Sequence, residues 1–253
     1  MPEGDTLHRA AAALQSLVGE QVSVRAVHPR ARAAGVAERV DGLTLDAVSA
    51  HGKNLLLAFD GGLVLRSHLG MTGSWRVLPA DADVRGAPWL VLRGARCQAV
   101  LRGGSRLDLT TRTAARLGPD ILAAAFDVRR AAARFRKVDP RSEIGDVLLD
   151  QTIVSGIGNI WRSEALWAAC VSPRRRVGEL ADDELVTILE EANRLMSLSV
   201  RGRAPTRQAY RRTGRPCTRC RHAIESRRQG EHGRTVYWCP GCQAGRGDGG
   251  AGA

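Results

Sequence analysis

The chain has 253 residues, which exceeds the usual size of one domain and predicts two domains with room for a small appended module. Hydrophobic residues make up 43% but aromatic residues only 4%, so the core is expected to consist mainly of Leu, Val, Ile and Ala. The 38 Lys and Arg residues against 26 Asp and Glu residues give a formal net charge of +12, which favours a polyanionic partner. No apolar run approaches the ~20 residues that span a bilayer, so the sequence predicts no membrane-spanning helix.

The first half of the chain is expected to hold one helix and then a series of strands. Residues 6–18 repeat apolar side chains at the spacing of one helix face, and Gly19 follows as a stop. From residue 22 to about residue 109 the pattern changes to short apolar runs separated by glycines, which is typical of hairpins. The clearest runs are Val22–Val27, Asn54–Phe59, Leu63–Leu65 and Trp89–Leu92.

Helical spacing returns in residues 120–200, which predicts a second, helical domain. Within it, residues 142–169 are expected to form a helix, turns at Gly156 and Gly158, and a second helix that begins at Asn159. The composition then becomes rich in arginine and cysteine. The last residues, 244–253, are mostly Gly and Ala and are expected to be disordered.

Four cysteines near the C-terminus have the spacing of a metal site. They form two pairs, each with two intervening residues, and eighteen residues that predict a hairpin separate the pairs. Four thiolates about 2.3 Å from one Zn²⁺ complete a closed tetrahedron, so the metal is expected to be structural and to stabilise a segment too small to fold alone. A redox pair is the alternative. The four predicted ligands are Cys217, Cys220, Cys239 and Cys242.

The other two cysteines, Cys97 and Cys170, stand alone and are expected to be buried structural thiols. The N-terminus lacks the basic and apolar regions of a secretory signal, so a reducing cytoplasm is expected. Arginines crowd the cysteine segment at a density suited to phosphate contacts, although a solvated charged surface is the alternative. They are Arg211, Arg212, Arg215, Arg219, Arg221, Arg227, Arg228 and Arg234.

Four separated segments carry a resemblance to one family. They are Pro2-Glu3-Gly4, His51-Gly52-Lys53-Asn54, QTIVSGIGNIWRSE at residues 151–164, and the segment from Arg234 to Gln243. In order and spacing the chain resembles bacterial formamidopyrimidine-DNA glycosylase and endonuclease VIII, and its Pro-Glu-Gly-Asp opening is closer to the endonuclease VIII branch.

The resemblance implies an α+β fold. A catalytic β-sandwich with an N-terminal helix would occupy residues 1–120, a helix–two-turn–helix domain residues 121–205, a zinc finger residues 206–243, and the disordered tail residues 244–253. One structural Zn²⁺ is the implied cofactor. Damaged double-stranded DNA is the implied partner, bound by a monomer in the bacterial cytoplasm, at the nucleoid.

The implied activity is that of a bifunctional DNA glycosylase and abasic-site lyase of base excision repair. Removal of Met1 would expose the secondary amine of Pro2, whose pKa of about 8 leaves part of it unprotonated at neutral pH. Such an amine can attack the sugar C1′, expel the base as a Schiff base forms, and permit strand cleavage by β,δ-elimination. By resemblance, Glu3 is the acid or base and Lys53 lies at the sugar or phosphate.

The resemblance also assigns four DNA-binding residues. Arg234 would grip the phosphates that flank the flipped-out nucleotide. Asn159 would hold a phosphate at the start of its helix, and His68 would contact a phosphate. Met71 would fill the space left by the extruded base. The alternatives are that Asn159 caps its helix and that Met71 belongs to the core.

Two departures from the family leave the substrate open. Thr6 stands where many relatives carry a glutamate, with Asp5 as the alternative carboxylate, and supports a catalytically weak member that binds damaged DNA. The short stretch between Ser199 and Cys217 favours oxidised pyrimidines, whereas Met71 is typical of the oxidised-purine branch. An unrelated basic RNA-binding or ribosomal protein would explain the charge and the zinc but not the four matching segments.

Overall fold

The computed structural model describes residues 1–104, 106–110, 117–230 and 233–244. The chain forms two compact units, residues 1–115 and 116–253. Apart from Ala244, the tail predicted to be disordered lies outside the described residues. Within the described part of the chain, no helix is both long enough and apolar enough to cross a membrane.

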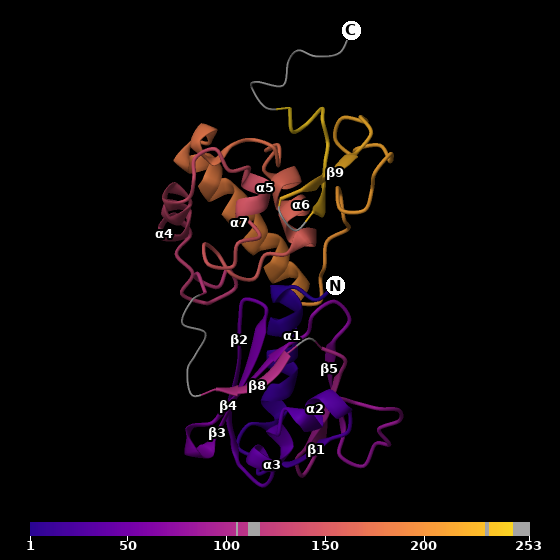
Figure 1. The fold of residues 1–253 in the computed structure, drawn as a ribbon. Coiled ribbons are helices and arrows are strands. Elements are labelled where there is room, and N and C mark those ends of the chain that lie inside the picture. The colour runs from indigo at the N-terminus through magenta and orange to yellow at the C-terminus, as the bar shows by residue number, and fades with distance from the viewer. Residues whose placement is uncertain (105, 111–116, 231–232, 245–253) are drawn as a thin grey trace. The chain divides into compact units, whose positions relative to one another are not determined.

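The first unit is a sandwich of two four-stranded antiparallel sheets, as the α+β prediction requires (Figure 1). Its strands are β1 (Ser23–Ala26), β2 (Leu45–His51), β3 (Asn54–Phe59), β4 (Val64–His68), β5 (Ser74–Pro79), β6 (Leu90–Arg93), β7 (Cys97–Arg102) and β8 (Arg106–Thr110). One sheet has the order β1-β6-β7-β5 and the other the order β2-β3-β4-β8. Leu57 of one sheet and Leu101 of the other share a single core with Leu14 of the N-terminal helix α1 (Gly4–Leu14), which is why the two sheets stay together.

Two short helices, α2 (Pro29–Ala33) and α3 (Val36–Val40), follow β1 where the sequence predicted only strands. Pro29 suits the first turn of a helix because its φ is already fixed there and its missing N–H needs no partner. The Nδ1 atom of His28 caps this helix by accepting a hydrogen bond from the Arg30 amide at 3.2 Å. The sequence did not predict these two helices because the apolar residues of this segment do not repeat at a clear helical period.

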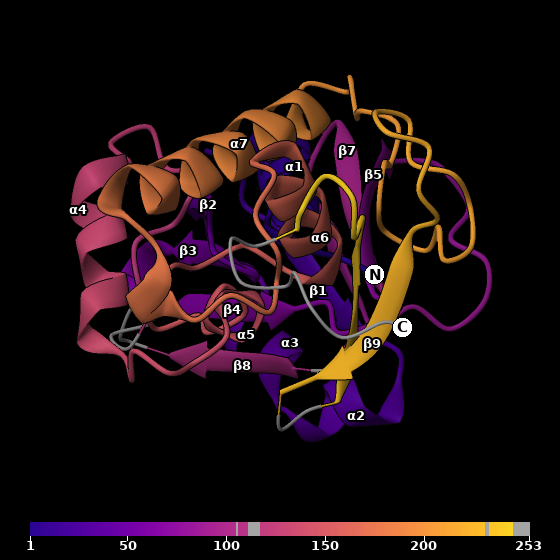
Figure 2. The same ribbon diagram turned by 90° about the horizontal axis from the view of Figure 1, so that it is seen from above.

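The second unit has a helical core. Its helices are α4 (Val128–Ala132), α5 (Ile144–Val147), α6 (Asn159–Ala168) and α7 (Asp182–Val200), with 3₁₀ turns at Ala133–Lys137 and Val177–Glu179. Helix α7 packs along α4 and α6 (Figure 2). It buries the predicted apolar stripe that includes Leu185, Ile188 and Leu189, and acidic residues in its first turn complement the helix dipole.

The predicted helix–turns–helix lies between α5 and α6, although α5 is only one turn long. Gln151 holds the turns together: its amide donates to the Leu149 and Ile157 carbonyls at 2.8 and 3.1 Å, and its oxygen accepts from Gly156 N–H at 3.0 Å. Gly156 has φ +105°, a conformation that favours glycine. This side-chain staple fixes where α6 begins.

An antiparallel hairpin of β9 (Glu225–Gln229) and β10 (Arg234–Trp238) joins the two cysteine pairs, as predicted. The expectation for the lone cysteines is wrong in part. Cys97 is half-buried, and Cys170 is exposed. Cys170 follows the end of α6 with φ +56°, and its sulfur accepts a hydrogen bond from Arg219 at 2.9 Å. Chain reversal at this helix end turns the thiol outward.

Candidate functional site

Pro2 and Glu3 lie immediately before α1. Glu3 occupies the N-cap position, and its backbone carbonyl accepts a hydrogen bond from Thr6 N–H at 2.9 Å. The Glu3 carboxylate does not cap the helix and is only 1% exposed, while Pro2 is half-buried. Asp5, the alternative carboxylate, is also buried and pairs with Arg9 at 3.6 Å. A backbone amine at position 2 would therefore lie next to a carboxylic acid withdrawn from water.

Lys53 lies in the tight turn of the β2–β3 hairpin, as predicted. Gly52 adopts φ +58° in this turn, and His51 pairs directly with Asn54 across it. The Asn54 amide donates to the His51 carbonyl at 3.4 Å. Because the turn is short and internally bonded, the Lys53 backbone is held at a defined place at the end of the sheet.

His68 ends strand β4 and pairs across the sheet with Asn54, the residue after Lys53. Its Nδ1 atom accepts a hydrogen bond from Gly70 N–H at 3.1 Å. Burial lowers the pKa of His68 below its usual value, and the nearby positive charges of Lys53, Arg106 and Arg66 lower it further. The structure therefore brings Lys53 and His68 together and keeps this imidazole neutral at neutral pH.

Met71 lies at the tip of the loop between β4 and β5. Its side chain is 68% exposed, so the alternative that Met71 is a core residue is wrong. The loop is constrained around it: Gly70 has φ +61°, and a Cβ atom on Gly73 would lie 2.4 Å from the Leu69 carbonyl oxygen. An exposed apolar side chain on a fixed loop can enter a base stack.

In the second unit, Asn159 is the first residue of α6, and Gly158 takes the N-cap position. The Asn159 side chain is 7% exposed and forms no cap bond; its amide donates to the Thr235 carbonyl of β10 at 2.9 Å. Its side-chain oxygen accepts from Arg162 at 2.5 Å. The helix-cap alternative for Asn159 is therefore wrong, and this side chain instead links α6 to the hairpin.

Arg234 begins β10, and its side chain is exposed. Its backbone carbonyl accepts a 3.3 Å hydrogen bond from Arg162, the same guanidinium that contacts Asn159. The two predicted DNA-binding residues of this unit are thus joined through one buried cation. The exposed Arg234 guanidinium is accessible to an anion.

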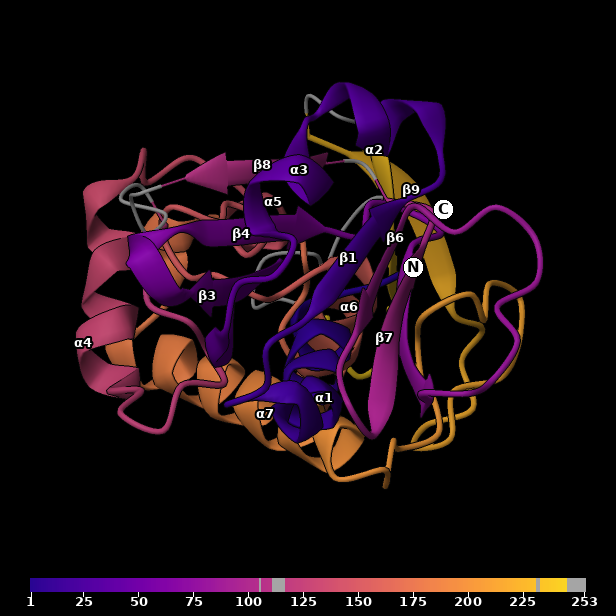
Figure 3. The ribbon, with the colours of Figure 1, turned by 90° about the horizontal axis from the view of Figure 1, so that it is seen from below.

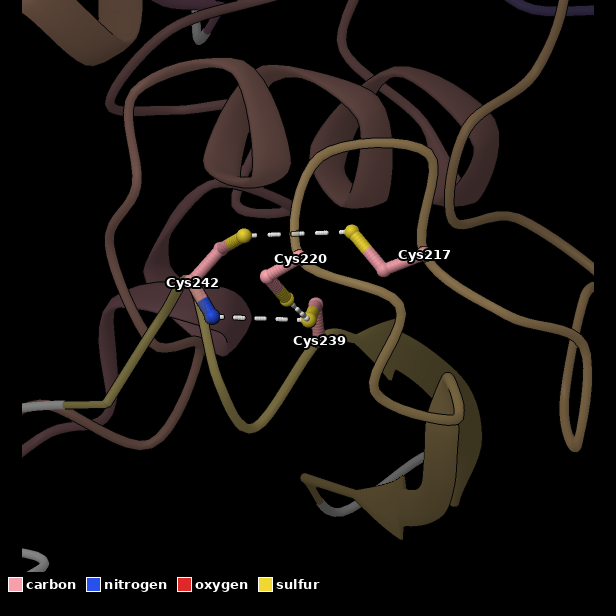
Figure 4. Close-up of side chains that lie close together, drawn as sticks. All are labelled: Cys217, Cys220, Cys239 and Cys242. Atoms are coloured by element: carbon pink, nitrogen blue, oxygen red, sulfur yellow. Dashed lines mark hydrogen bonds between the residues drawn. The ribbon is translucent and has the colours of Figure 1, made fainter.

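The four cysteine sulfurs form a compact cluster, and Figure 4 draws the sulfurs of Cys217 and Cys242 facing each other. That pair is 3.8 Å apart, Cys220 and Cys239 are 3.3 Å apart, and all four sulfurs lie within 4.8 Å of one another. Sulfurs placed about 2.3 Å from a central Zn²⁺ would be about 3.8 Å apart, so the donor set fits one tetrahedral zinc. The His222 backbone amide, followed by the Cys242 and Cys239 thiols, lowers the pKa of Cys220 to about 6. Burial raises the pKa values of Cys239 and Cys242, so binding of Zn²⁺ would have to displace their protons.

Several buried polar residues escaped the sequence prediction. Glu164 accepts hydrogen bonds of 2.7, 3.0 and 2.8 Å from the backbone amides of residues 208, 209 and 210. Gln243 accepts from Cys239 N–H and donates to the Val171 carbonyl, each at 2.7 Å. Arg162 and Glu164 were both inside the segment that carried the resemblance, but polar side chains on a helix are ordinarily expected to face solvent.

Each of the two units matches a domain of one class of DNA repair glycosylases. The formamidopyrimidine-DNA glycosylase N-terminal domain matches residues 1–117, and the formamidopyrimidine-DNA glycosylase H2TH domain matches residues 117–209. The chain belongs to the formamidopyrimidine-DNA glycosylase and endonuclease VIII family, which confirms the resemblance and the predicted fold class.

Named relatives cover nearly the whole chain. It is 35% identical to the probable endonuclease 8 2 of Streptomyces coelicolor over 97% of this chain and 95% of that protein. It is 32% identical to the DNA-(apurinic or apyrimidinic site) lyase Nei2 of Mycolicibacterium smegmatis over 96% and 99%. Among solved structures, Lactococcus lactis Fpg with DNA containing N7-benzyl-Fapy-dG is similar, with a TM-score of 0.82, 25% identity, and coverage of 96% of this chain and 99% of that one.

Proposed function

We propose that this protein removes oxidised bases, preferentially pyrimidines, from damaged duplex DNA and then cleaves the strand, with the Pro2 amine as nucleophile. One observation carries the proposal: in a chain of this family, Pro2 directly precedes the Glu3 carboxylate, which is 1% exposed. A buried carboxylic acid beside a secondary amine suits acid–base chemistry at neutral pH.

The reaction has two stages. The nitrogen of Pro2 bonds to the sugar C1′, the bond from C1′ to the base breaks, and the base leaves with a proton that Glu3 supplies. The proton of the Pro2 nitrogen passes to the sugar ring oxygen, which leaves C1′ as a hydroxyl and gives an open-chain iminium that acidifies the C2′ proton. The Glu3 carboxylate accepts that proton as the bond from C3′ to the phosphate oxygen breaks, and a second elimination breaks the bond from C5′ to its phosphate oxygen. Water finally releases Pro2.

Lys53, His68 and Met71 would act on the lesion strand. A cation at Lys53 stabilises developing oxyanion or phosphate charge. The Nδ1 atom of His68 accepts the Gly70 N–H, so the proton of the neutral ring lies on Nε2, the atom that would donate to a phosphate oxygen. Met71, with its side chain 68% exposed, would replace the extruded base in the stack.

In the second unit, Asn159 and Arg234 would hold the phosphates that flank the extruded nucleotide. The N-terminus of α6 offers backbone N–H groups to an anion, and the exposed Arg234 guanidinium supplies a charge-assisted contact. The four cysteines would hold one structural Zn²⁺, which supplies folding energy to the hairpin that carries Arg234.

The preference for oxidised pyrimidines is supported by the short segment between Ser199 and Cys217, which leaves little room for a long loop over an oxidised purine. The exposed Met71 favours oxidised purines as the second candidate substrate. We further propose that residues 1–120, 121–205 and 206–243 act as catalytic, DNA-binding and zinc-finger parts of a monomer. It would work on nucleoid DNA in a bacterial cytoplasm.

Borohydride trapping tests the mechanism. The wild type, Pro2→Gly, and a form with one extra residue before Pro2 are each mixed with duplexes carrying an abasic site, an oxidised pyrimidine or an oxidised purine. We expect the wild type to form a reduced covalent adduct, and to form it faster with the oxidised pyrimidine than with the oxidised purine. The extended form should give no adduct, because its Pro2 nitrogen is part of a peptide bond. No adduct at any lesion, or an equal yield from the extended form, would overturn the proposal. Mass spectrometry of the wild type should find Met1 removed.

A further inference from the structure

A hollow of about 500 Å³ opens on the first unit, apart from the residues assigned above. Helix α2 contributes one wall, the strands β4 and β8 contribute another, and the indole of Trp89 completes the lining. It is lined by Arg30, Arg66, Trp89, Arg106, Leu107 and Asp108. Three positive groups and one negative group leave two positive charges, which favours an anion.

The sheet register connects this hollow to the candidate site. Strands β4 and β8 lie side by side (Figure 3), with His68 opposite Arg106 and Arg66 opposite Asp108. Residues two apart on a strand share a face about 6.8 Å from each other. Arg66 and Arg106 therefore lie on the sheet face of His68, in a row of cations that continues from Lys53.

The three arginines differ in how strongly each one is paired with a carboxylate. Arg66 donates two hydrogen bonds to one Asp108 oxygen, at 3.1 and 2.7 Å, whereas Arg106 is 3.8 Å from the other oxygen and 63% exposed. No described residue accepts a hydrogen bond from the Arg30 guanidinium, which is exposed. Asp108 thus holds Arg66 in place while Arg30 and Arg106 keep donors for a ligand.

The backbone of Arg30 is fixed before any ligand binds. His28 accepts the Arg30 N–H at 3.2 Å, and its ring stacks on Trp89 at 5.0 Å with an interplanar angle of 17°. Trp89 is only 9% exposed. Since its ring has little free area, the hollow does not suit a stacked base, and the arginines favour a phosphate instead.

We infer that Arg30, Arg66 and Arg106 bind a backbone phosphate of the DNA, next along the row from the contacts of Lys53 and His68. This inference rests on the proposed function, because it takes duplex DNA as the ligand. The phosphate would accept hydrogen bonds from Arg30 and Arg106, while Asp108 keeps Arg66 in place beside them.

Salt-dependent binding tests the site. Duplex DNA with a tetrahydrofuran abasic analogue is titrated with the wild type, Arg30→Ala, Arg106→Ala and the control Arg93→Ala, whose exposed arginine lies on β6 of the other sheet. Each phosphate contact contributes about 0.9 to the slope of log K against log salt, which corresponds to about fivefold in Kd at 0.15 M salt. We expect Arg30→Ala and Arg106→Ala each to lose up to about that much slope and affinity, because the two arginines share one phosphate, and Arg93→Ala to match the wild type.

A scan with single methylphosphonates locates the contact. At one position outside the lesion nucleotide, removing the phosphate charge should weaken the binding of the wild type more than the binding of Arg30→Ala, which has lost one of the cations at that phosphate. The inference would be overturned if Arg30→Ala and Arg106→Ala had the same slope as Arg93→Ala, or if they lost affinity with no change in slope. It would also be overturned if the wild type were equally sensitive to methylphosphonates at every position. Failure of wild-type trapping by borohydride would instead overturn the proposed chemistry, since these binding measurements involve no catalysis.

Discussion

The buried guanidinium of Arg162 donates a 2.5 Å hydrogen bond to the side-chain oxygen of Asn159, one helical turn earlier on α6. This contact fixes the amide orientation, so that the Asn159 nitrogen faces the Thr235 carbonyl. Arg162 is 0% exposed and also donates to the Gly145 carbonyl and the Gln229 side chain, at 3.0 and 3.3 Å. One cation therefore joins α5, α6 and the hairpin.

Replacing Arg162 with methionine should lower the free energy of unfolding by about 3 kcal/mol, because it leaves several buried acceptors without a donor. It should also weaken DNA binding, since Asn159 and the Arg234 backbone lose a shared partner. Urea unfolding checks the first effect. The matched control is Arg194→Met, whose surface pair with Glu191 is expected to contribute at most about 0.5 kcal/mol. Equal losses from both variants would contradict this account.

The cysteine cluster predicts one zinc per chain. Cys239→Ser should abolish stoichiometric zinc binding and DNA binding together, because three thiolates cannot close the tetrahedral site that orders the hairpin. Cys170→Ser is the matched control, since its exposed thiol lies outside the cluster. Atomic emission and Kd measurements distinguish the two. One zinc per chain in Cys239→Ser would be incompatible with a four-cysteine site.

The sequence predicted best the features that depend on local spacing. The C-x₂-C pairs, the hairpin between them and the start of α6 at Asn159 follow from residues close together in the chain. The juxtaposition of Lys53 and His68 depends instead on strand register, which pairs Asn54 with His68. No pattern in a single strand specifies its partner.

Arg162 escaped prediction for a related reason. Helical periodicity assigns polar residues to a solvent face, yet α6 is buried from Asn159 to Leu166 because the hairpin and two other helices surround it. Its polar side chains are satisfied by backbone groups distant in sequence, such as residues 208–210 for Glu164. Such partners become visible only in the folded chain.

Stability should depend on pH through His68. Its pKa is lowered in the folded state by burial and by Lys53, Arg106 and Arg66, so between that value and about 6.5 the unfolded chain binds more protons. The free energy of unfolding should therefore fall as pH decreases below about 6.5 and level off above it. His68→Asn should remove this part of the pH dependence. Urea unfolding at several pH values checks it, and identical pH profiles for both proteins would refute the assignment.

Replacing Met71 should affect base excision much more than the stability of the fold. Because its side chain is 68% exposed, Met71→Ala should change the free energy of unfolding by less than about 0.5 kcal/mol. Base excision should nevertheless slow about tenfold, since the extruded base would leave an unfilled gap in the stack, which costs on the order of 1 kcal/mol or more. Met196→Ala offers the opposite case: that methionine is 0% exposed within α7, and its truncation should cost about 2–5 kcal/mol. Single-turnover excision and urea unfolding measure the two effects. If Met71→Ala destabilised the fold as much as Met196→Ala, or excised bases at the wild-type rate, Met71 would have no role as a wedge.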